Sequence, residues 1–424
     1  MSVVFFIRVM NDFDHALPII DFISRIKKEN VIVYGVGDKY KSCKQHLDYL
    51  NKILGIKERS FEECFYSDTD MRLFNFFNKL SRLKIGKSKL LNIPISILVI
   101  NLQRIVNLYL TKIVRLFFKG LPKEETCILM DFGTESTFPY NAIIKKCQSS
   151  NIPIVAYLHG FSIFTNLDPI KIEKTKLPYK LNLKMQQVLY GKYLGRHFDR
   201  YLVGVGQKST LFKSNFSQHF MHYDLVDEIG MPRYSKEWSE IFINKYNMQH
   251  PSLDAFPNNN NINVVLFLSS AKYSVKLDAF NNMIESLATL ACINLIIKPH
   301  PRFELAEIND ISDKAKVSVC DSPTLIKWAD IAILYGSSIG FDVLVNKKQL
   351  IIPRFVHTNT TVFEDYNVSK VVDSIDELMD YLKNYPDKDG SNLKDIQLFL
   401  RKYVYGENKS YSELLNRYTY YIKD

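Results

Sequence analysis

Residues 293–302 read Ile-Asn-Leu-Ile-Ile-Lys-Pro-His-Pro-Arg, a short apolar run followed at once by a basic, proline-rich loop. Apart from Asn294 the run is continuously apolar, and it does not alternate between polar and apolar residues. This pattern is typical of a strand in a parallel sheet that is covered on both faces. Because helices provide that cover, the stretch indicates an α/β fold.

Similar apolar runs recur along the whole chain. They are Val3–Val9, Val31–Val36, Cys127–Met130, Ile154–Leu158, Tyr201–Val205, Asn263–Leu268, Val317–Val319, Ile331–Leu334 and Gln349–Ile352. Stretches of helical length, such as Leu277–Leu290 and Thr324–Trp328, lie between them. Strands that alternate with helices in this way predict βα units and parallel sheets.

A linker divides the βα pattern in two. Between Pro232 and Ile262 the chain contains Pro257 and the run Asn258–Asn261, which are turn and linker residues. We therefore predict two Rossmann-like doubly wound domains that face each other across a cleft. Residues 1–235 and 236–405 form the two domains, and residues 406–424 form a C-terminal helix. Such a cleft lies at the carboxyl ends of the strands, where open α/β sheets bind their ligands.

The basic loop after residues 293–297 is the strongest candidate site. Pro299 and Pro301 stiffen the backbone, so that Lys298, His300 and Arg302 are presented together at a strand's carboxyl end. Two cations and an imidazole on one loop suit a phosphate or pyrophosphate ester. The alternative is a surface turn without a ligand.

A second loop follows the strand Ile331–Leu334. It reads Tyr335-Gly336-Ser337-Ser338 and opens a helix, so that its hydroxyls and backbone N–H groups suit an anion. A simple helix N-cap is the alternative for either serine. Neither loop matches the phosphate-loop or dinucleotide fingerprints, so the motifs do not indicate a P-loop NTPase or a nicotinamide enzyme.

Two loops in the first half carry candidate catalytic groups at strand ends. Asp131 and Glu135 follow one strand and are candidate bases or nucleophiles, and His159 follows the next as a candidate base or phosphate ligand. We expect both loops to open on the same cleft. Alternatively, Asp131 caps a turn and Glu135 is a solvated loop residue.

The positive charge of the chain is concentrated in one segment. Of 55 basic residues, ten lie within residues 71–120, which contain no Asp or Glu, and the rest of the chain carries 45 residues of each sign. This distribution argues against a nucleic-acid partner. From residue 101 the polar residues recur at helical spacing, which predicts an amphipathic helix suited to an anionic membrane surface. The membrane-facing candidates are Lys84, Lys87, Lys89, Arg104 and Arg115. The alternative is a helix packed on the first sheet with a solvated cationic edge.

Cysteine spacing and hydropathy favour a cytoplasmic protein. The six cysteines form no metal-binding or disulfide pattern, which favours reduced core thiols and no metal site. The apolar N-terminus is followed by Asp12 and Asp14, and therefore resembles a buried strand more than a signal peptide. No segment reaches the roughly 20 apolar residues that a transmembrane helix needs.

Taken together, these motifs resemble the GT-B glycosyltransferases of surface polysaccharide assembly that carry a His-Pro motif. This group includes Kdo transferases, polysialyltransferases and the CDP-glycerol glycerophosphotransferases of teichoic acid synthesis. The similar pieces are Leu158–Gly160, Ile229–Arg233, Lys298–Arg302, Ala329-Asp330, Gly336–Ser338 and Gln349–Arg354. The Glu-Asp-Gly signature of the polysialyltransferases is absent.

The resemblance implies a role for each matching residue. Phosphate of the donor would contact Lys298, His300 and Arg302 together with Ser337 and Ser338, while Tyr335 or Gly336 would line the nucleotide pocket. Glu135 or Asp131 would be the acidic catalytic residue, and the loop that carries His159 would face the acceptor. Members of the GT-B class need no catalytic metal, so the resemblance implies no cofactor beyond a CMP- or UDP-linked sugar donor.

The function expected from these observations is sugar transfer from a nucleotide sugar to a growing bacterial surface polysaccharide, such as capsule, O-antigen or a related lipid-linked glycan. The enzyme would act in the cytoplasm, on the inner face of the cytoplasmic membrane. Three alternatives remain: a transferase that uses a CDP-alditol to add glycerol or ribitol phosphate, a nucleotide-sugar epimerase of the same fold, and a non-catalytic binding partner.

Overall fold

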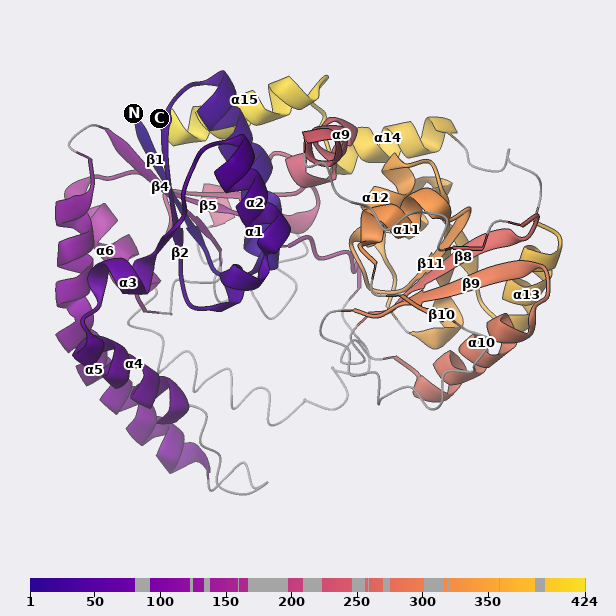
Figure 1. Ribbon diagram of the computed structural model, residues 1–424, viewed down its shortest axis with the longest axis horizontal. Helices are drawn as coiled ribbons and strands as arrows, with labels where there is room; N and C mark the ends of the chain where they lie inside the picture. The colour runs from indigo at the N-terminus through magenta and orange to yellow at the C-terminus, as the bar shows by residue number, and fades with distance from the viewer. Residues whose placement is uncertain are drawn as a thin grey trace.

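The computed structural model describes residues 1–80, 92–122, 125–132, 138–158, 160–166, 197–208, 223–245, 256–257, 259–269, 275–300, 316–318, 320–357, 359–385 and 393–423. They form two lobes, each built around one parallel sheet, as Figure 1 shows. The expected α/β architecture of two Rossmann-like domains is confirmed.

The first sheet has seven strands in the order β3-β2-β1-β4-β5-β6-β7, all parallel. Their bounds are β1 Ser2–Ile7, β2 Asn30–Gly35, β3 Arg59–Ser60, β4 Thr126–Asp131, β5 Ile154–Tyr157, β6 Arg200–Val203 and β7 Val226–Glu228. Around it lie α1 Met10–Asp21, α2 Lys44–Asp48, α3 Phe61–Phe65, α4 Asp68–Leu80, α5 Asn92–Gly120 and α6 Tyr140–Ser150.

The second sheet has six parallel strands in the order β10-β9-β8-β11-β12-β13. They are β8 Ile262–Phe267, β9 Ile293–Lys298, β10 Lys316–Val317, β11 Ile331–Leu334, β12 Gln349–Pro353 and β13 Lys370–Val372. The helices of the second half are α9 Lys236–Lys245, α10 Leu277–Thr289, α11 Ser322–Trp328, α12 Ile339–Val345, α13 Ile375–Lys383, α14 Leu393–Tyr403 and α15 Tyr411–Lys423.

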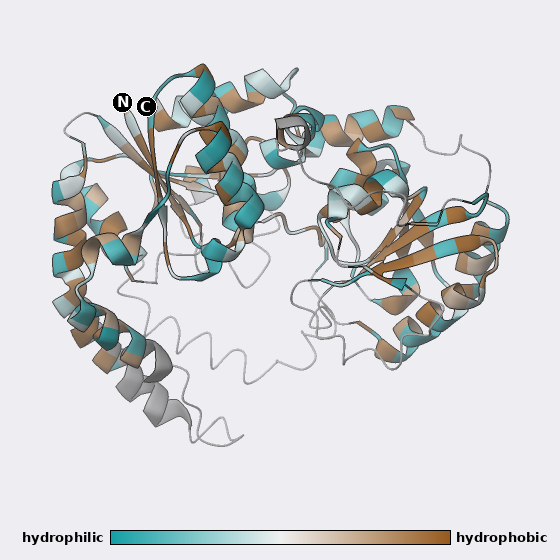
Figure 2. Cartoon of the chain, viewed as in Figure 1, coloured by the Kyte–Doolittle hydropathy of each residue, from teal (hydrophilic) through white to brown (hydrophobic). Residues whose placement is uncertain are grey.

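Burial on both faces explains why the strands are continuously apolar. In β1, Val4 and Phe6 pack into one core cluster, whereas Phe5 and its neighbours Val3 and Ile7 pack into the cluster on the opposite face. The long central strands are accordingly mostly brown in Figure 2. Every apolar run that we predicted to be a strand is one, and the strands that the sequence did not indicate, β3, β7 and β13, have two or three residues each.

The C-terminal helix α15 packs on the first lobe. Leu414, Leu415 and Tyr418 are buried in the same cluster as Val3 and Phe5 of β1. In Figure 1 this yellow helix lies against the indigo N-terminal elements, and the two ends of the chain are close together. The last helix therefore returns across the molecule after the second sheet is complete.

Two glycines allow the returning chain to cross the linker in contact with it. Gly230 has a φ of +97°, and a Cβ atom built there would lie 2.7 Å from the Val404 carbonyl oxygen. Gly406 has a φ of +58°, and its Cβ would lie 2.4 Å from the carbonyl oxygen of Ile229. Across the same crossing, the N–H of Met231 donates to the Val404 carbonyl at 2.7 Å. The backbones thus approach closer than any other residue type permits.

We expect Gly230→Ala to lower the free energy of unfolding by about 2 kcal/mol or more, because it adds both an unfavourable φ and a clash with backbone. Gly37→Ala is the matched control, since Gly37 has a φ of +73° but no atom within 4 Å of its Cβ position. Urea unfolding of the two variants measures the difference. Equal losses would show that the close crossing does not contribute.

Candidate functional site

A cavity of about 360 Å3 lies between the two lobes and is lined by both. From the first lobe it receives α1, α2 and the loop after β5, and from the second it receives the loops after β8, β9 and β11. The linker helix η7, Pro232–Tyr234, closes one side. The cavity therefore lies where carboxyl ends of parallel strands from both sheets meet, the usual ligand position in open α/β sheets.

The basic loop contributes its described residues to this cavity. Lys298 is the last residue of β9, Pro299 and His300 follow it, and all three line the cavity. Burial lowers the pKa of the half-buried Lys298, and attraction from Asp321 partly offsets this effect. A partly desolvated cation next to an imidazole is suited to bind an anionic group that enters the cavity. Arg302 lies outside the described residues.

The hydroxyl-bearing loop faces the same cavity. Ser337 and Ser338 line it at the start of α12, and the N–H of Ile339 donates to the Ser337 hydroxyl at 3.4 Å. That long contact gives partial support to the alternative that Ser337 caps the helix. Gly336 has a φ of +65° and packs against Phe164 of the first lobe, since a Cβ there would lie 3.1 Å from the Phe164 ring. Tyr335 is 1% exposed and its ring packs between Phe280 and His357, behind the cavity wall.

The first lobe presents a carboxylate and two histidines from its first two helices. Asp14 and His15 of α1 and His46 of α2 line the cavity. His46 Nε2 and Asp14 Oδ1 are 2.6 Å apart. Sequence analysis left both histidines unassigned, because 31 positions separate them and neither follows a predicted strand directly. The signal that brings them together is tertiary, since α2 packs against α1.

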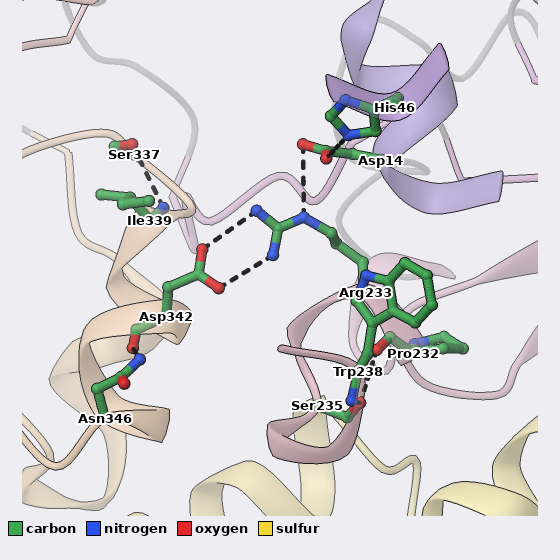
Figure 3. A network of polar contacts seen from close by, with 10 residues as sticks. All are labelled: Asp14, His46, Pro232, Arg233, Ser235, Trp238, Ser337, Ile339, Asp342 and Asn346. Atoms are coloured by element: carbon green, nitrogen blue, oxygen red, sulfur yellow. Dashed lines mark hydrogen bonds and ion pairs between the residues drawn. The ribbon is translucent and has the colours of Figure 1, made fainter. Parts of the chain in front are cut away.

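Arg233 joins the two lobes at this cavity. Its guanidinium donates to both carboxylate oxygens of Asp342 in α12, at 3.0 and 3.3 Å, and its Nε lies 3.4 Å from Asp14 Oδ2 (Figure 3). Burial disfavours the charged form of Asp14, but Arg233 and His46 outweigh this effect and hold its pKa well below the usual range. The result is a carboxylate–guanidinium–carboxylate bridge from α1 to α12.

A second contact between the lobes lies beside the bridge. Phe164, six residues beyond Leu158, pairs with Thr361 in an antiparallel bridge, and the Val362 N–H donates to the Ile163 carbonyl at 2.8 Å. Gly160 at the start of this segment lines the cavity. The loop that carries His159 is thus tied to the second lobe, although His159 itself lies outside the described residues.

Asp131 is held away from the cavity lining. It ends β4, is fully buried, and accepts hydrogen bonds from Arg8 Nε at 3.1 Å and from Arg8 Nη2. A carboxylate paired with a guanidinium is stabilised in its charged form and is a weaker base. Through this ion pair with Arg8, Asp131 joins the end of β4 to the residue that follows β1. Its catalytic role stays a prediction, and Glu135 lies outside the described residues.

The described residues include no group of three or more His, Cys, Asp and Glu side chains that could hold a metal ion. The six cysteines are unpaired, and Cys43, Cys127 and Cys147 are buried, whereas Cys64 is exposed.

Solved structures with the same fold align over nearly the whole chain. The kitacinnamycin glycotransferase has a TM-score of 0.56 at 10% identity and covers 99% of each chain. The UDP-GlcNAc 2-epimerase from Neisseria meningitidis, bound to UDP-GlcNAc, has a TM-score of 0.51 at 13% identity over 100% of both chains. The wall teichoic acid polymerase TagF has a TM-score of 0.50 at 12% identity, over 100% of this chain and 89% of that one. The expected GT-B fold is confirmed, and at these identities the likeness extends to the fold alone.

No protein-family model matches the sequence, and no curated protein matches it.

We expect Arg233→Gln to lower the free energy of unfolding by about 3 kcal/mol, because it leaves two carboxylates facing each other without their cation. Arg401→Gln is the control, since Arg401 pairs with Glu407 on the surface with both side chains at least 60% exposed. Arg401→Gln should lower the free energy of unfolding by less than about 1 kcal/mol. Chemical denaturation of both variants measures the difference, and equal losses would mean that the bridge does not hold the lobes.

Proposed function

We propose that this chain is a glycosyltransferase that moves a sugar from a nucleotide-sugar donor to a growing surface polysaccharide. The observation that carries the proposal is the convergence of Lys298, His300, Ser337 and Ser338 on one cavity, opposite Asp14 and two histidines of the other lobe. One wall carries anion-binding groups, and the other carries the imidazoles of His15 and His46. This division suits a phosphate leaving group on one side and a hydroxyl acceptor on the other.

The second lobe would bind the donor. Lys298 and His300, with Arg302 on the same loop, neutralise the phosphate of a CMP- or UDP-linked sugar, and Ser337 and Ser338 donate hydrogen bonds to it. As the bond between the anomeric carbon and the phosphate oxygen breaks, the electron pair leaves with the phosphate. The cations stabilise that charge, and no cofactor is required. Two solved relatives in fold carry UDP or UDP-GlcNAc, which is consistent with a nucleotide donor.

The first lobe would bind the acceptor and supply the base. The acceptor oxygen attacks the anomeric carbon while its proton passes to the base. Glu135 remains the first candidate, and His159 the second, because the ion pair with Arg8 makes Asp131 a poorer one. His46 adds a further candidate that lines the cavity, since its hydrogen bond to Asp14 orients the imidazole.

Two alternative reactions would also use this fold and a site that binds phosphate. One is nucleotide-sugar epimerisation, since a UDP-GlcNAc 2-epimerase has the same fold, and the other is transfer of an alditol phosphate from a CDP-alditol, since a wall teichoic acid polymerase has it too. Product analysis separates all three reactions. A glycosyltransferase adds a sugar to the acceptor and an alditol-phosphate transferase adds glycerol or ribitol phosphate, each with release of free nucleotide. An epimerase instead returns an altered nucleotide sugar without any acceptor.

The acceptor in this proposal is lipid-linked, and the enzyme works in the cytoplasm on the inner face of the membrane. The acid-free segment 71–120 supports this placement through its charge. Of the membrane-facing candidates, Arg115 is exposed on α5, and Arg104 belongs to the same helix. Lys84, Lys87 and Lys89 lie outside the described residues.

We expect CMP, CDP or UDP to raise the melting temperature of the protein. His300→Ala should lower the affinity for the stabilising nucleotide about tenfold or more, because a charge-assisted contact to phosphate is lost. The control is Lys327→Ala, which removes an exposed cation from the far end of α11. Thermal-shift titration with CMP, CDP, UDP, GDP and ADP measures both. Stabilisation by none of the five would reject the donor site.

We expect Glu135→Ala to retain nucleotide affinity and to lose turnover by about a hundredfold or more, as befits a general base. Release of nucleotide from the donor in the presence of acceptor is the readout, and His46→Gln is tested in parallel. Full turnover of Glu135→Ala with a loss in His46→Gln would transfer the role of base to His46.

A further inference from the structure

One face of the long helix α5 packs into the core of the first lobe. Val106, Leu110, Ile113, Val114 and Phe117 are buried in the cluster that covers one face of the first sheet. In Figure 1 this helix runs along the outer side of the first lobe, and its N-terminal end extends beyond the sheet together with α4. The helix therefore packs on the first sheet, as in the alternative given by the sequence, and Arg115 and Lys119 are exposed on it.

The opposite, outer face also carries large apolar side chains. Ile105 is 62% exposed, Leu108 is 72%, Tyr109 is 50% and Leu116 is 49%. With about 100° of rotation per residue, these four and the cations Lys112, Arg115 and Lys119 occupy one arc of about 120°. Single exposed apolar residues are ordinary, but a row of them along one helix face indicates a contact surface.

The charges around this row select the kind of partner. Arg115 and Lys119 are exposed, and Lys112 is held by Asp70 of α4 at 2.7 Å and by the Tyr109 hydroxyl at 3.0 Å. A second copy of this chain docked symmetrically would bring like charges together, which opposes association. An anionic bilayer offers both an apolar interior and phosphate groups at its rim, and therefore matches both features.

We propose that the outer face of α5 inserts into the surface of an anionic membrane. Ile105, Leu108 and Leu116 enter the boundary between headgroups and acyl chains, Tyr109 lies at headgroup depth, and Arg115 and Lys119 contact lipid phosphates. This inference rests on the membrane placement proposed above and deepens it by naming the side chains that insert. It differs from a purely electrostatic contact in a measurable way. Salt screens a purely electrostatic contact, whereas apolar insertion persists. Among the described residues no helix is long and apolar enough to span a bilayer.

The test is sedimentation with vesicles of equimolar phosphatidylcholine and phosphatidylglycerol, at low salt and at about 1 M salt. The triple variant Ile105→Ser, Leu108→Ser, Leu116→Ser should bind about tenfold more weakly than the natural chain at both salt concentrations. The matched control is Leu277→Ser with Leu398→Ser, which removes two leucines that are 44% exposed on α10 and α14. That control should bind as the natural chain does.

A second measurement does not depend on the loss of binding. Leu108→Trp should be quenched by brominated lipids in the same vesicles, and Leu398→Trp should not. Undiminished vesicle binding of the triple variant, or an unquenched Trp at position 108, would overturn the insertion. A change from dimer to monomer in the triple variant would assign the face to self-association instead. Nucleotide-induced stabilisation of the triple variant, measured in parallel, reports on the donor site separately, so that failure of either proposal is recognised independently.

Discussion

The Arg233 bridge is the contact on which the geometry of the cavity depends. A single guanidinium in the linker binds Asp342 of the second lobe through two hydrogen bonds and lies against Asp14 of the first. Asp342 belongs to the helix that follows the serine loop, and Asp14 to the helix that follows β1. The bridge therefore sets the distance between the two cavity walls. Because the guanidinium is mostly buried between the two carboxylates, its loss would leave two negative charges facing each other without a cation.

The chain crossing at Gly230 and Gly406 supports this arrangement from outside the cavity. It brings α15 back to the first lobe, where Tyr418 donates to the Gly230 carbonyl at 2.9 Å. The two lobes are thus joined by the linker, by the returning chain and by the short antiparallel contact of Phe164 with Thr361. These contacts define how the two lobes are positioned, and a ligand that fills the cavity would touch both lobes.

The first lobe combines two surfaces with different chemistry. Its cavity side carries Asp14, His15 and His46, whereas its outer side carries the apolar and cationic face of α5. If the acceptor is lipid-linked, as proposed, both surfaces belong on the lobe that meets the membrane. The second lobe then needs no membrane contact, in keeping with the charge balance outside residues 71–120.

The amino-acid sequence by itself determined the fold class, the longer strands and the loops at their carboxyl ends. Lys298, His300, Ser337 and Ser338 were located because two-sided burial makes a parallel strand continuously apolar, so that its end is visible in the chain. Sequence periodicity also revealed the helix that became α5.

Only the tertiary structure decided which side chains meet. It paired Asp131 with Arg8, 123 positions away, and brought His46 to Asp14 and Arg233 to Asp342. It also decided that Leu108 faces outward and Leu110 inward, although both are leucines in one apolar helix. The reason is that these contacts depend on how elements distant in the sequence pack in space, whereas residue spacing records only the periodicity of each element by itself.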